Sequence, residues 1–416
     1  MKILWITNIL FPEAISFLTT GKELKSSGGW LLGAANILVK QNDIELTVAT
    51  VSTLVTKLEF IKGHTINYYV IPYGKGNDKY NLDYEKYWIE IRKHLSPDIV
   101  HIHGSEFSHG LAYVNACGSD NVVLSIQGLK SVYSPYYHYG ISDKEVMKHI
   151  TLHDILSRSM FKEKKMFCLS GILEKKLICK INHIIGRTSW DRAHTWAINP
   201  DASYYFCNET LRDEFYDGSR WNYEKCNKHS IFLSQAGYAI KGLHQMLKAL
   251  PLILRHYPDT CIRIAGQSLM REKGISGLKH YSGYKKYINN LIKKYHLENN
   301  ILFTGSLSAE QMKQEYLKAN VFVCPSSIEN SPNSLGEAQL LGVPCISSYI
   351  GGAMDMMVGN ECNLYRFEEI EMLAYKVCEI FSNKENQINM SSVAKERHSR
   401  EKNCLQLIKI YKTIIK

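Results

Sequence analysis

Short apolar runs alternate with amphipathic stretches along nearly the whole chain. The apolar runs are three to seven residues long and predict buried strands, whereas the stretches between them carry apolar residues at helical spacing. In the first half, helices are predicted between many of these strands, for example at Trp30–Lys40 and Ser189–Ala197. The predicted strands are Ile3–Thr7, Ile44–Thr50, Asn67–Ile71, Asp98–His101, Val122–Ile126, His183–Ile185 and Ser203–Phe206. Strands that alternate with helices predict parallel sheets covered by helices on both faces.

The alternation stops at residues 217–229, which are polar and aperiodic and therefore predict a linker. It restarts at Ser230, and Ser308 and Gln311 have the spacing of a capping box that opens a helix. The second half contains predicted strands at Ser230–Ser234, Cys261–Ala265, Ile301–Phe303, Val321–Pro325 and Val343–Ser348, and predicted helices at Leu243–Tyr257 and Tyr284–Tyr295.

The chain of 416 residues is too long for one compact core and suits two domains. We predict two α/β, Rossmann-like domains whose parallel sheets face a central cleft, one at residues 1–216 and one at 230–395. A final helical segment, 396–416, is expected to pack back toward the first domain.

The composition limits which classes of binding partner and which cellular compartment are expected. Lys and Arg outnumber Asp and Glu by 50 to 40, a balance that suits phosphorylated ligands, an anionic membrane surface or nucleic acid. The basic residues are not interleaved with aromatic ones and no nucleic-acid motif is present, so nucleic acid is not expected. The eleven cysteines form no CxxC pair, which predicts free thiols in the cytoplasm and no zinc site.

No apolar run is long enough to span a membrane, and the first residues read as a strand instead of a signal peptide. The segment Met160–Lys180 mixes six lysines with apolar residues. Such a helix either touches an anionic membrane surface or packs its apolar face inward. We therefore expect a cytoplasmic protein with a possible peripheral contact to the inner face of the cell membrane.

Two carboxylates in the second half point to chemistry. Glu329 lies in the loop after the predicted strand 321–325, and Glu337 lies in the first turns of the next helix. Ligands bind at the carboxyl ends of strands in open α/β sheets, and the N–H groups of a helix start suit a phosphate. The pair predicts a grip on the hydroxyls of a nucleotide sugar, although solvated surface acids would show the same spacing.

Three other positions are candidates, each with a plain structural alternative. Lys241 follows the strand 230–234 and a loop containing Gly237, where a lysine can neutralise a diphosphate or simply lie in solvent. His103 follows a strand, on the same side as His101, where it either contacts substrate or is a satisfied core histidine. The pair Gly28-Gly29 precedes a helix and either admits a ligand or is a turn.

Together these features resemble the retaining glycosyltransferases of family 4, which have the GT-B fold. The resemblance covers nearly the whole chain and is densest from Ser230 to Asp355. It is carried by Pro97–His103, Lys241-Gly242, Pro325-Ser326-Ser327, the pair Glu329 and Glu337, Leu341–Ile346 and Gly351-Gly352.

The resemblance implies a catalytic group of Glu329, Lys241 and His103. Glu329 would hold donor-sugar hydroxyls, Lys241 would stabilise the diphosphate leaving group, and His103 would contact the transferred sugar or the acceptor. The donor-binding residues would be Glu337, on the ribose hydroxyls, with Ser334, Leu335, Asn333, Gly28, Gly29 and Gly237. The first domain would bind the acceptor and the second the nucleotide sugar.

The activity that the resemblance implies is that of a hexosyltransferase. It would move a sugar from a UDP- or GDP-sugar to a glycan or lipid-linked acceptor with retention, in surface polysaccharide biosynthesis, without cofactor or metal. Two departures stand out. Ala236 occupies the position of a family arginine, and Gln127-Gly128 replaces a common histidine, so the tract 127–139 is expected to shape acceptor choice. Another GT-B enzyme, such as a nucleotide-sugar epimerase or a phosphorylase, and a non-catalytic nucleotide-sugar-binding protein stay open.

Overall fold

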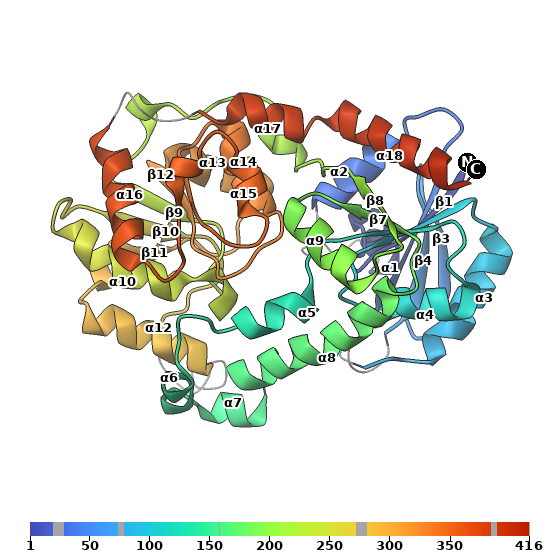
Figure 1. The fold of residues 1–416 in the computed structure, drawn as a ribbon, viewed down its shortest axis with the longest axis horizontal. Helices are drawn as coiled ribbons and strands as arrows, with labels where there is room; N and C mark the ends of the chain where they lie inside the picture. The colour runs from blue at the N-terminus through green and yellow to red at the C-terminus, as the bar shows by residue number, and fades with distance from the viewer. Residues whose placement is uncertain (20–28, 74–78, 158, 272–280, 384–388, 416) are drawn as a thin grey trace. The chain divides into compact units, whose positions relative to one another are not determined.

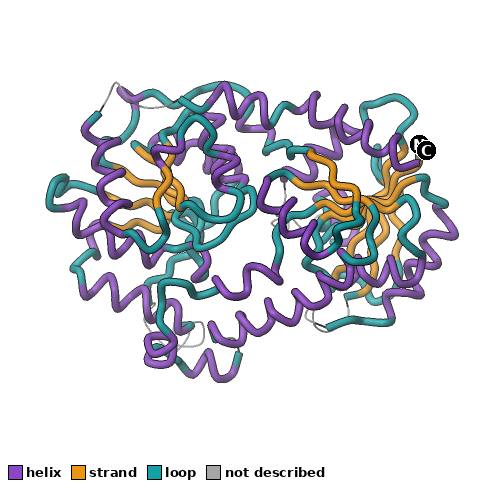
Figure 2. The backbone as a smooth tube through the Cα atoms, viewed as in Figure 1, coloured by secondary structure: helices purple, strands orange, loops and turns teal. Residues whose placement is uncertain are grey.

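The fold is taken from a computed structural model that describes residues 1–19, 29–73, 79–157, 159–271, 281–383 and 389–415 (Figure 1). The chain divides into two compact units. Unit 1 comprises residues 1–132, 166–212 and 398–416, and unit 2 comprises residues 133–165 and 213–397. Each unit contains one sheet with helices packed around it (Figure 2).

The sheet of unit 1 has eight strands in the order β3-β4-β2-β1-β5-β6-β7-β8. All neighbours are parallel except β3 and β4, which are antiparallel. The strands are β1 Lys2–Ile6, β2 Glu45–Ser52, β3 Glu59–Lys62, β4 Asn67–Pro72, β5 Ile99–His103, β6 Val122–Ser125, β7 His183–Gly186 and β8 Ser203–Phe206. The sequence therefore predicted seven of these strands, with ends that differ by a residue or two.

Alternating residues of β1 enter the two cores of unit 1, since successive side chains of a strand point to opposite faces. Leu4 and Ile6 pack in one core and Ile3 and Trp5 in the other. The helices are α1 Pro12–Leu18, α2 Gly29–Leu38, α3 Asp83–Leu95, α4 Ser108–Cys117, α9 Ser189–Ile198 and α18 Arg400–Ile415. The helices α5 Lys130–Tyr133 and α8 Met160–Ile178 run from one unit into the other.

The sheet of unit 2 is entirely parallel, with the order β11-β10-β9-β12-β13-β14. Its strands are β9 Ser230–Leu233, β10 Cys261–Ile264, β11 Ile301–Phe303, β12 Val321–Cys324, β13 Cys345–Ser348 and β14 Leu364–Tyr365. Its helices are α6 Asp143–Lys148, α7 Leu152–Leu156, α10 Leu243–Leu254, α12 Gly283–Lys294, α13 Ala309–Lys318, α14 Asn333–Leu341, α15 Ala353–Met356, α16 Ile370–Ser382 and α17 Ser391–Arg397. The predicted capping box of Ser308 and Gln311 is present at α13.

The predicted domain limits differ from the structure in two ways. Residues 133–165 fall inside the predicted first domain but belong to unit 2. The predicted linker 217–229 is also part of unit 2, because its backbone is bonded to that unit: Trp221 N–H donates to the carbonyl of Leu341 at 2.9 Å, and Asn227 N–H to that of Lys318 at 2.9 Å. The polar composition of this segment reflects hydrogen bonding and not a free connection between domains.

Helix α18 is part of unit 1, where it packs on α2 and β5. The buried hydroxyl of Tyr411 lies 2.9 Å from Trp5 Nε1 and 2.6 Å from His101 Nδ1. A single hydroxyl therefore serves two buried side chains of the sheet. In the described part of the chain, no helix is both long and apolar enough to cross a membrane.

Tyr411→Phe is expected to destabilise the protein by about 1–3 kcal/mol, because the indole N–H of Trp5 would stay buried without its acceptor. Urea unfolding measures the change. The matched control is Tyr375→Phe, at an exposed tyrosine, which should leave the unfolding midpoint almost unchanged. Equal midpoints for the two variants would contradict the anchoring role of Tyr411.

Candidate functional site

The strand order of unit 2 reverses between β9 and β12, which are neighbours in the sheet although they are far apart in sequence. From this pair the chain adds β10 and β11 on one side and β13 and β14 on the other. The loops after β9 and β12 leave toward opposite faces of the sheet. In such sheets, ligands bind at this switch point, in the crevice at the carboxyl ends of the strands. Lys241 follows β9 and Glu329 follows β12, so both candidate residues belong to this switch point.

The structure brings Lys241 and Glu329 together. Lys241 Nζ donates to Glu329 Oε1 at 2.6 Å, and Ser326 Oγ donates to the same oxygen at 2.9 Å. The two charged side chains are largely buried, with 17% and 13% of their surfaces exposed. The sequence named both residues but not their pairing, because residues 88 positions apart meet only through the sheet.

Two glycines hold the backbone at this place. Gly242 has φ of +70°, and a Cβ there would lie 1.6 Å from the carbonyl oxygen of Pro325. Gly351 has φ of +49°, and a Cβ there would lie 1.8 Å from the carbonyl oxygen of Glu329. Only glycine permits both the left-handed backbone and this close approach. The Lys-Gly and Gly-Gly motifs thus fix the backbone around the Glu329 loop.

Helix α14 begins at Asn333, directly after the Glu329 loop, and it contains Glu337, which is buried with 3% exposed. The first N–H groups of a helix have no acceptor within it. Leu335 N–H, however, already donates to the carbonyl of Pro332 at 3.0 Å. Asn333 and Ser334 precede it in the first turn, and the predicted phosphate contact from Leu335 stays a prediction.

The electrostatics favour a charged Lys241. Burial lowers the pKa of Lys241, but the neighbouring Glu329 carboxylate more than offsets this, so the net pKa is raised. Ala236, at the position where the resembling family has an arginine, is buried and supplies no positive charge. Arg263 is engaged by Glu315 through bonds of 2.6 and 2.9 Å. Lys248 Nζ donates to the carbonyl of Gly140 at 3.1 Å. Of these three cations, Lys241 is the one that contacts Glu329 at the switch point.

In unit 1 the strand order reverses between β1 and β5, and His103 is the last residue of β5. His103 therefore ends the strand instead of following it. Its ring stacks on that of His101 with centroids 3.7 Å apart, as alternation predicts. His101 is satisfied by Tyr411 and by Ser125 Oγ at 2.5 Å. In contrast, His103 Nε2 is buried with no hydrogen-bond partner among the described residues.

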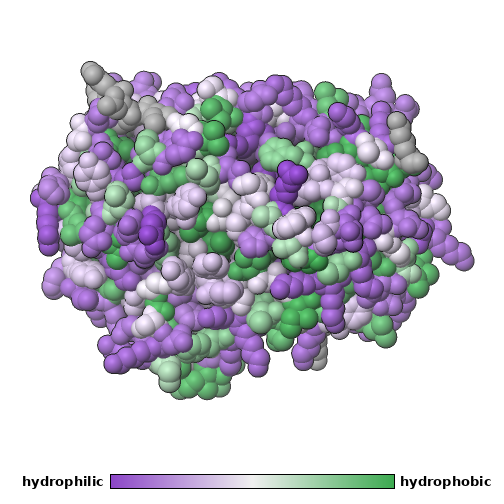
Figure 3. All heavy atoms as spheres, in the orientation of Figure 1, coloured by the Kyte–Doolittle hydropathy of each residue, from purple (hydrophilic) through white to green (hydrophobic). Residues whose placement is uncertain are grey.

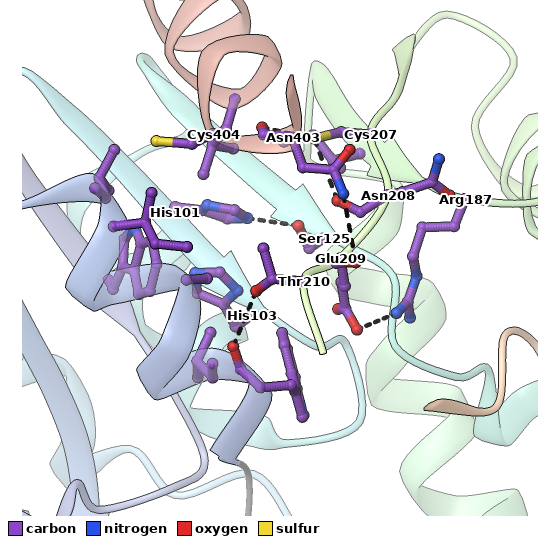
Figure 4. A pocket seen from close by; sticks show the side chains of 18 of the residues that line it. His101, His103, Ser125, Arg187, Cys207, Asn208, Glu209, Thr210, Asn403 and Cys404 are labelled. Carbon is purple, nitrogen blue, oxygen red and sulfur yellow. Dashed lines mark hydrogen bonds and ion pairs between the residues drawn. The ribbon is translucent and has the colours of Figure 1, made fainter. Parts of the chain in front are cut away.

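His103 lines a cavity of about 60 Å³ at the carboxyl end of this sheet (Figure 4). Apolar side chains of α2 and α18, including Leu31 and Leu407, are part of its lining. The lining also includes Arg187 and Glu209, which form an ion pair. Burial and the nearby His101 hold the pKa of His103 well below its usual range, so His103 is neutral at pH 7 and can accept or donate one hydrogen bond.

Glu106 is a residue of this region that the sequence did not single out. It lies in the loop after β5, and its Oε2 is sealed from water without a hydrogen-bond partner in the described ranges. Burial raises the pKa of Glu106 from its ordinary 4.5 to about 7, and Glu174 nearby adds to the effect. A lone glutamate in a loop gives no sequence signal, because its burial comes from tertiary packing.

The glycine predictions have different outcomes. Gly28 lies outside the described residues, whereas Gly29 is the first residue of α2. A Cβ at Gly237 would meet nothing within 4 Å, so packing of the described structure does not require glycine there. Among the described residues, no group of three or more His, Cys, Asp or Glu side chains could hold a metal ion.

Part of the chain is similar to known proteins. A sequence model of the family described as glycosyl transferases group 1 matches residues 220–397, which lie in unit 2. D-inositol 3-phosphate glycosyltransferase of Corynebacterium urealyticum is 25% identical over 181 residues, which cover 42% of this chain and 41% of that protein. The chain thus matches less than half of this relative. Both findings support the prediction of a glycosyltransferase.

Solved structures are similar over the whole chain. Sucrose-phosphate synthase from Thermosynechococcus elongatus has a TM-score of 0.70 at 14% identity, covering 99% of this chain and 98% of that one. Anabaena HepE in complex with UDP and glucose has a TM-score of 0.62 at 15% identity, covering 98% of each chain. Likeness at such low identity shows the fold, and it confirms the prediction of GT-B.

Glu106→Gln should change how stability depends on pH. Because the folded pKa of Glu106 lies above 4.5, the folded protein binds more protons than the unfolded chain between about pH 4.5 and 7, and stability falls as pH rises. The variant lacks this loss. Its unfolding midpoint in urea, relative to the original protein, should therefore increase from pH 5 to pH 8. A constant difference between the two proteins would show that Glu106 titrates normally.

Proposed function

We propose that the chain is a glycosyltransferase that moves a hexose from a UDP- or GDP-sugar to a glycan or lipid-linked acceptor with retention of anomeric configuration. The observation that carries this proposal is the contact of Lys241 with Glu329 at the switch point of unit 2, beside the start of α14. A cation, a carboxylate and a helix start are the groups that a diphosphate attached to a sugar requires.

Each group has a distinct role in the proposal. Lys241 and the N–H groups of Asn333 and Ser334 bind the diphosphate, whose charge grows as the bond to the sugar breaks. Glu329 accepts hydrogen bonds from hydroxyls of the donor sugar. Glu337 accepts those of the ribose. Fixed charges aimed at a leaving group stabilise the transition state more than the ground state.

Retention follows from the chemistry of the leaving group in this proposal. The departing phosphate accepts the proton of the acceptor hydroxyl on the same face of the sugar, so attack and departure share that face. Lys241 and the helix start supply the positive charge, and we propose that neither a metal nor a cofactor is required.

The acceptor is assigned to unit 1, at the carboxyl end of its sheet. His103 supports this role because its buried Nε2 has no partner among the described residues and because it is neutral. A neutral imidazole suits a sugar hydroxyl better than a phosphate, since it can either donate or accept. Gly28, Gly29 and Gly237 remain proposed donor contacts.

The donor choice rests on comparison. One similar structure holds UDP and glucose, which supports a nucleoside diphosphate sugar without deciding between uridine and guanosine. Family 4 membership, a cytoplasmic place and a role in surface polysaccharide synthesis belong to the same proposal. The relative from Corynebacterium urealyticum is named as a glycosyltransferase. This name does not favour the alternatives of an epimerase, a phosphorylase or a non-catalytic protein.

A donor screen tests the proposed function. Binding to the native state raises the melting temperature, so UDP- and GDP-sugars are compared with the free nucleotides by thermal shift. The donor that binds is then incubated with glycan acceptors, and the anomeric proton of the product is observed by NMR. A product with inverted configuration would reject retention, and an isomerised donor without any acceptor would identify an epimerase.

Lys241→Met is expected to lower kcat by about 100- to 1,000-fold, because it removes one electrostatic contact to the leaving diphosphate. It should also cost about 1–3 kcal/mol of stability, since the Glu329 carboxylate loses its charged partner. Steady-state kinetics and urea unfolding measure the two effects separately.

The double variant Lys241→Met/Glu329→Gln is the matched control. Neutralising Glu329 should restore most of the stability but none of the activity. If kcat of Lys241→Met were nearly normal, another cation would carry the diphosphate. If the double variant were no more stable than the single one, the buried ion pair would not explain the stability loss.

Glu337→Ala is expected to weaken nucleotide binding, because each charge-assisted hydrogen bond to the ribose contributes roughly 1.5–3 kcal/mol. Calorimetry with the free nucleoside diphosphate measures the affinity. Glu310→Ala, at an exposed glutamate of α13, is the control and should bind normally. Unchanged affinity in a folded Glu337→Ala protein would remove Glu337 from the site.

A further inference from the structure

An exposed apolar surface covers α6 and α7 in unit 2. Met147, Leu152, Ile155 and Leu156 expose 64%, 77%, 63% and 85% of their surfaces, and Ile150 between the two helices is also exposed. Figure 3 shows this hydrophobic patch at the lower edge of the molecule. Single exposed apolar residues are ordinary, but five within ten residues form a patch that needs an explanation.

The patch is not a consequence of loose packing, because buried polar groups hold it from behind. The buried carboxylate of Asp154 accepts hydrogen bonds from Thr151 N–H at 2.8 Å and from Gly283 N–H, at the start of α12, at 3.0 Å. His149 Nε2 lies 2.9 Å from Asn290 Nδ2 of α12. Helix α7 is therefore fixed with the carboxylate of Asp154 inward and its leucine and isoleucine side chains outward.

Leu152, Ile155 and Leu156 follow the spacing i, i+3, i+4, so they share the outer face of α7. This arrangement inverts the usual pattern, in which an amphipathic helix buries its apolar face. Because α7 has only five residues and its inner face is already bonded, the outer face has no role in the described packing of unit 2.

Lysines surround the patch. The ammonium group of Lys162 donates to the carbonyls of Ile155 at 2.9 Å and Ser157 at 3.2 Å, so it lies at the end of α7. Lys286 Nζ lies 3.5 Å from the carbonyl of Ile150. Lys144 and Lys148 are exposed on α6.

The acidic residues of α6 are already paired. Asp143 lies 2.9 Å from His138 Nε2, and Glu145 lies 3.9 Å from Lys148 Nζ. The border of the patch is therefore positive, with four lysines against two acids. Positive charge around an apolar tip complements an anionic surface.

We propose that this surface, defined by Met147, Ile150, Leu152, Ile155 and Leu156, inserts into the interfacial region of a bilayer that contains anionic lipids. Apolar side chains bury in the boundary between headgroups and acyl chains while the lysines stay among the phosphates. The surface precedes the segment 160–180, for which the sequence analysis considered a membrane contact. Most of its apolar side chains are more exposed than those of that segment.

A second copy of the chain fits the surface less well. Five side chains are few compared with the roughly 20–30 residues that each partner contributes to a stable interface. A symmetric contact would also bring the same lysines of two copies together, and like charges disfavour such a contact.

Co-sedimentation of the full chain with vesicles tests the proposal. Vesicles of phosphatidylcholine alone are compared with an equimolar mixture of phosphatidylcholine and phosphatidylglycerol. We expect binding to the mixed vesicles only, weakened by added salt because the Debye length shortens from about 10 Å at 0.1 M toward about 3 Å at 1 M. Equal binding to both vesicle types, or binding to neither, would overturn the proposal.

The variant Leu152→Gln/Ile155→Gln/Leu156→Gln should weaken partitioning into the mixed vesicles by at least about tenfold, since it removes most of the apolar area that enters the interface. The control Leu82→Gln/Ile89→Gln/Leu405→Gln replaces three exposed aliphatic residues elsewhere and should bind normally. Melting curves verify that both variants fold. Normal vesicle binding by the first variant would overturn the proposal.

Sedimentation velocity without vesicles tests whether a second copy of the chain, instead of a membrane, covers the surface. The original protein should show no association that the first triple variant abolishes. Self-association lost in that variant alone would assign the surface to a contact between copies and reject the membrane. Because this readout and the vesicle assay need no donor sugar, their outcome is independent of the proposed transferase activity.

Discussion

The reversal of strand order in each sheet is the constraint on which the rest of the molecule depends. A parallel sheet that grows in two directions from a central pair sends the two following loops to opposite sides. At β9 and β12 those loops carry Lys241 and Glu329. At β1 and β5 the reversal brings His103 to the sheet's carboxyl end. In both units, the polar groups therefore lie at the carboxyl ends of the two central strands.

Local patterns were sufficient to predict what depends on one element. The strand-loop-helix pattern located Glu329 in the loop after β12 and Glu337 in α14, and the spacing of Ser308 and Gln311 predicted a real capping box. Strand alternation predicted that His101 and His103 share a face, and their rings stack. These features follow from periods of 2.0 and 3.6 residues, which the sequence displays directly.

Features that depend on distant partners were not predictable. The segment 217–229 looks like a linker because it is polar, yet Trp221 bonds to Leu341 and thereby joins unit 2. The assignment of residues 133–165 to unit 2 likewise depends on contacts such as that of Asp154 with Gly283. A sequence shows which groups are polar, but the structure alone shows which partners satisfy them. The same reasoning explains why Glu106 and the engaged N–H of Leu335 were not foreseen.

The pairing of Lys241 with Glu329 also bears on which ligands suit the proposed site. Each residue currently satisfies the other in a largely buried place. A free diphosphate that attracted Lys241 would leave the carboxylate without its cation, and a free sugar that engaged Glu329 would compete with the ammonium group. A buried charge without a partner is costly. A nucleotide sugar supplies an anion for Lys241 and hydroxyl donors for Glu329 in one molecule, so it replaces both lost contacts at once. On the proposed roles, the ion pair therefore favours the intact donor over either of its parts, and it re-forms when the sugar and the nucleotide separate.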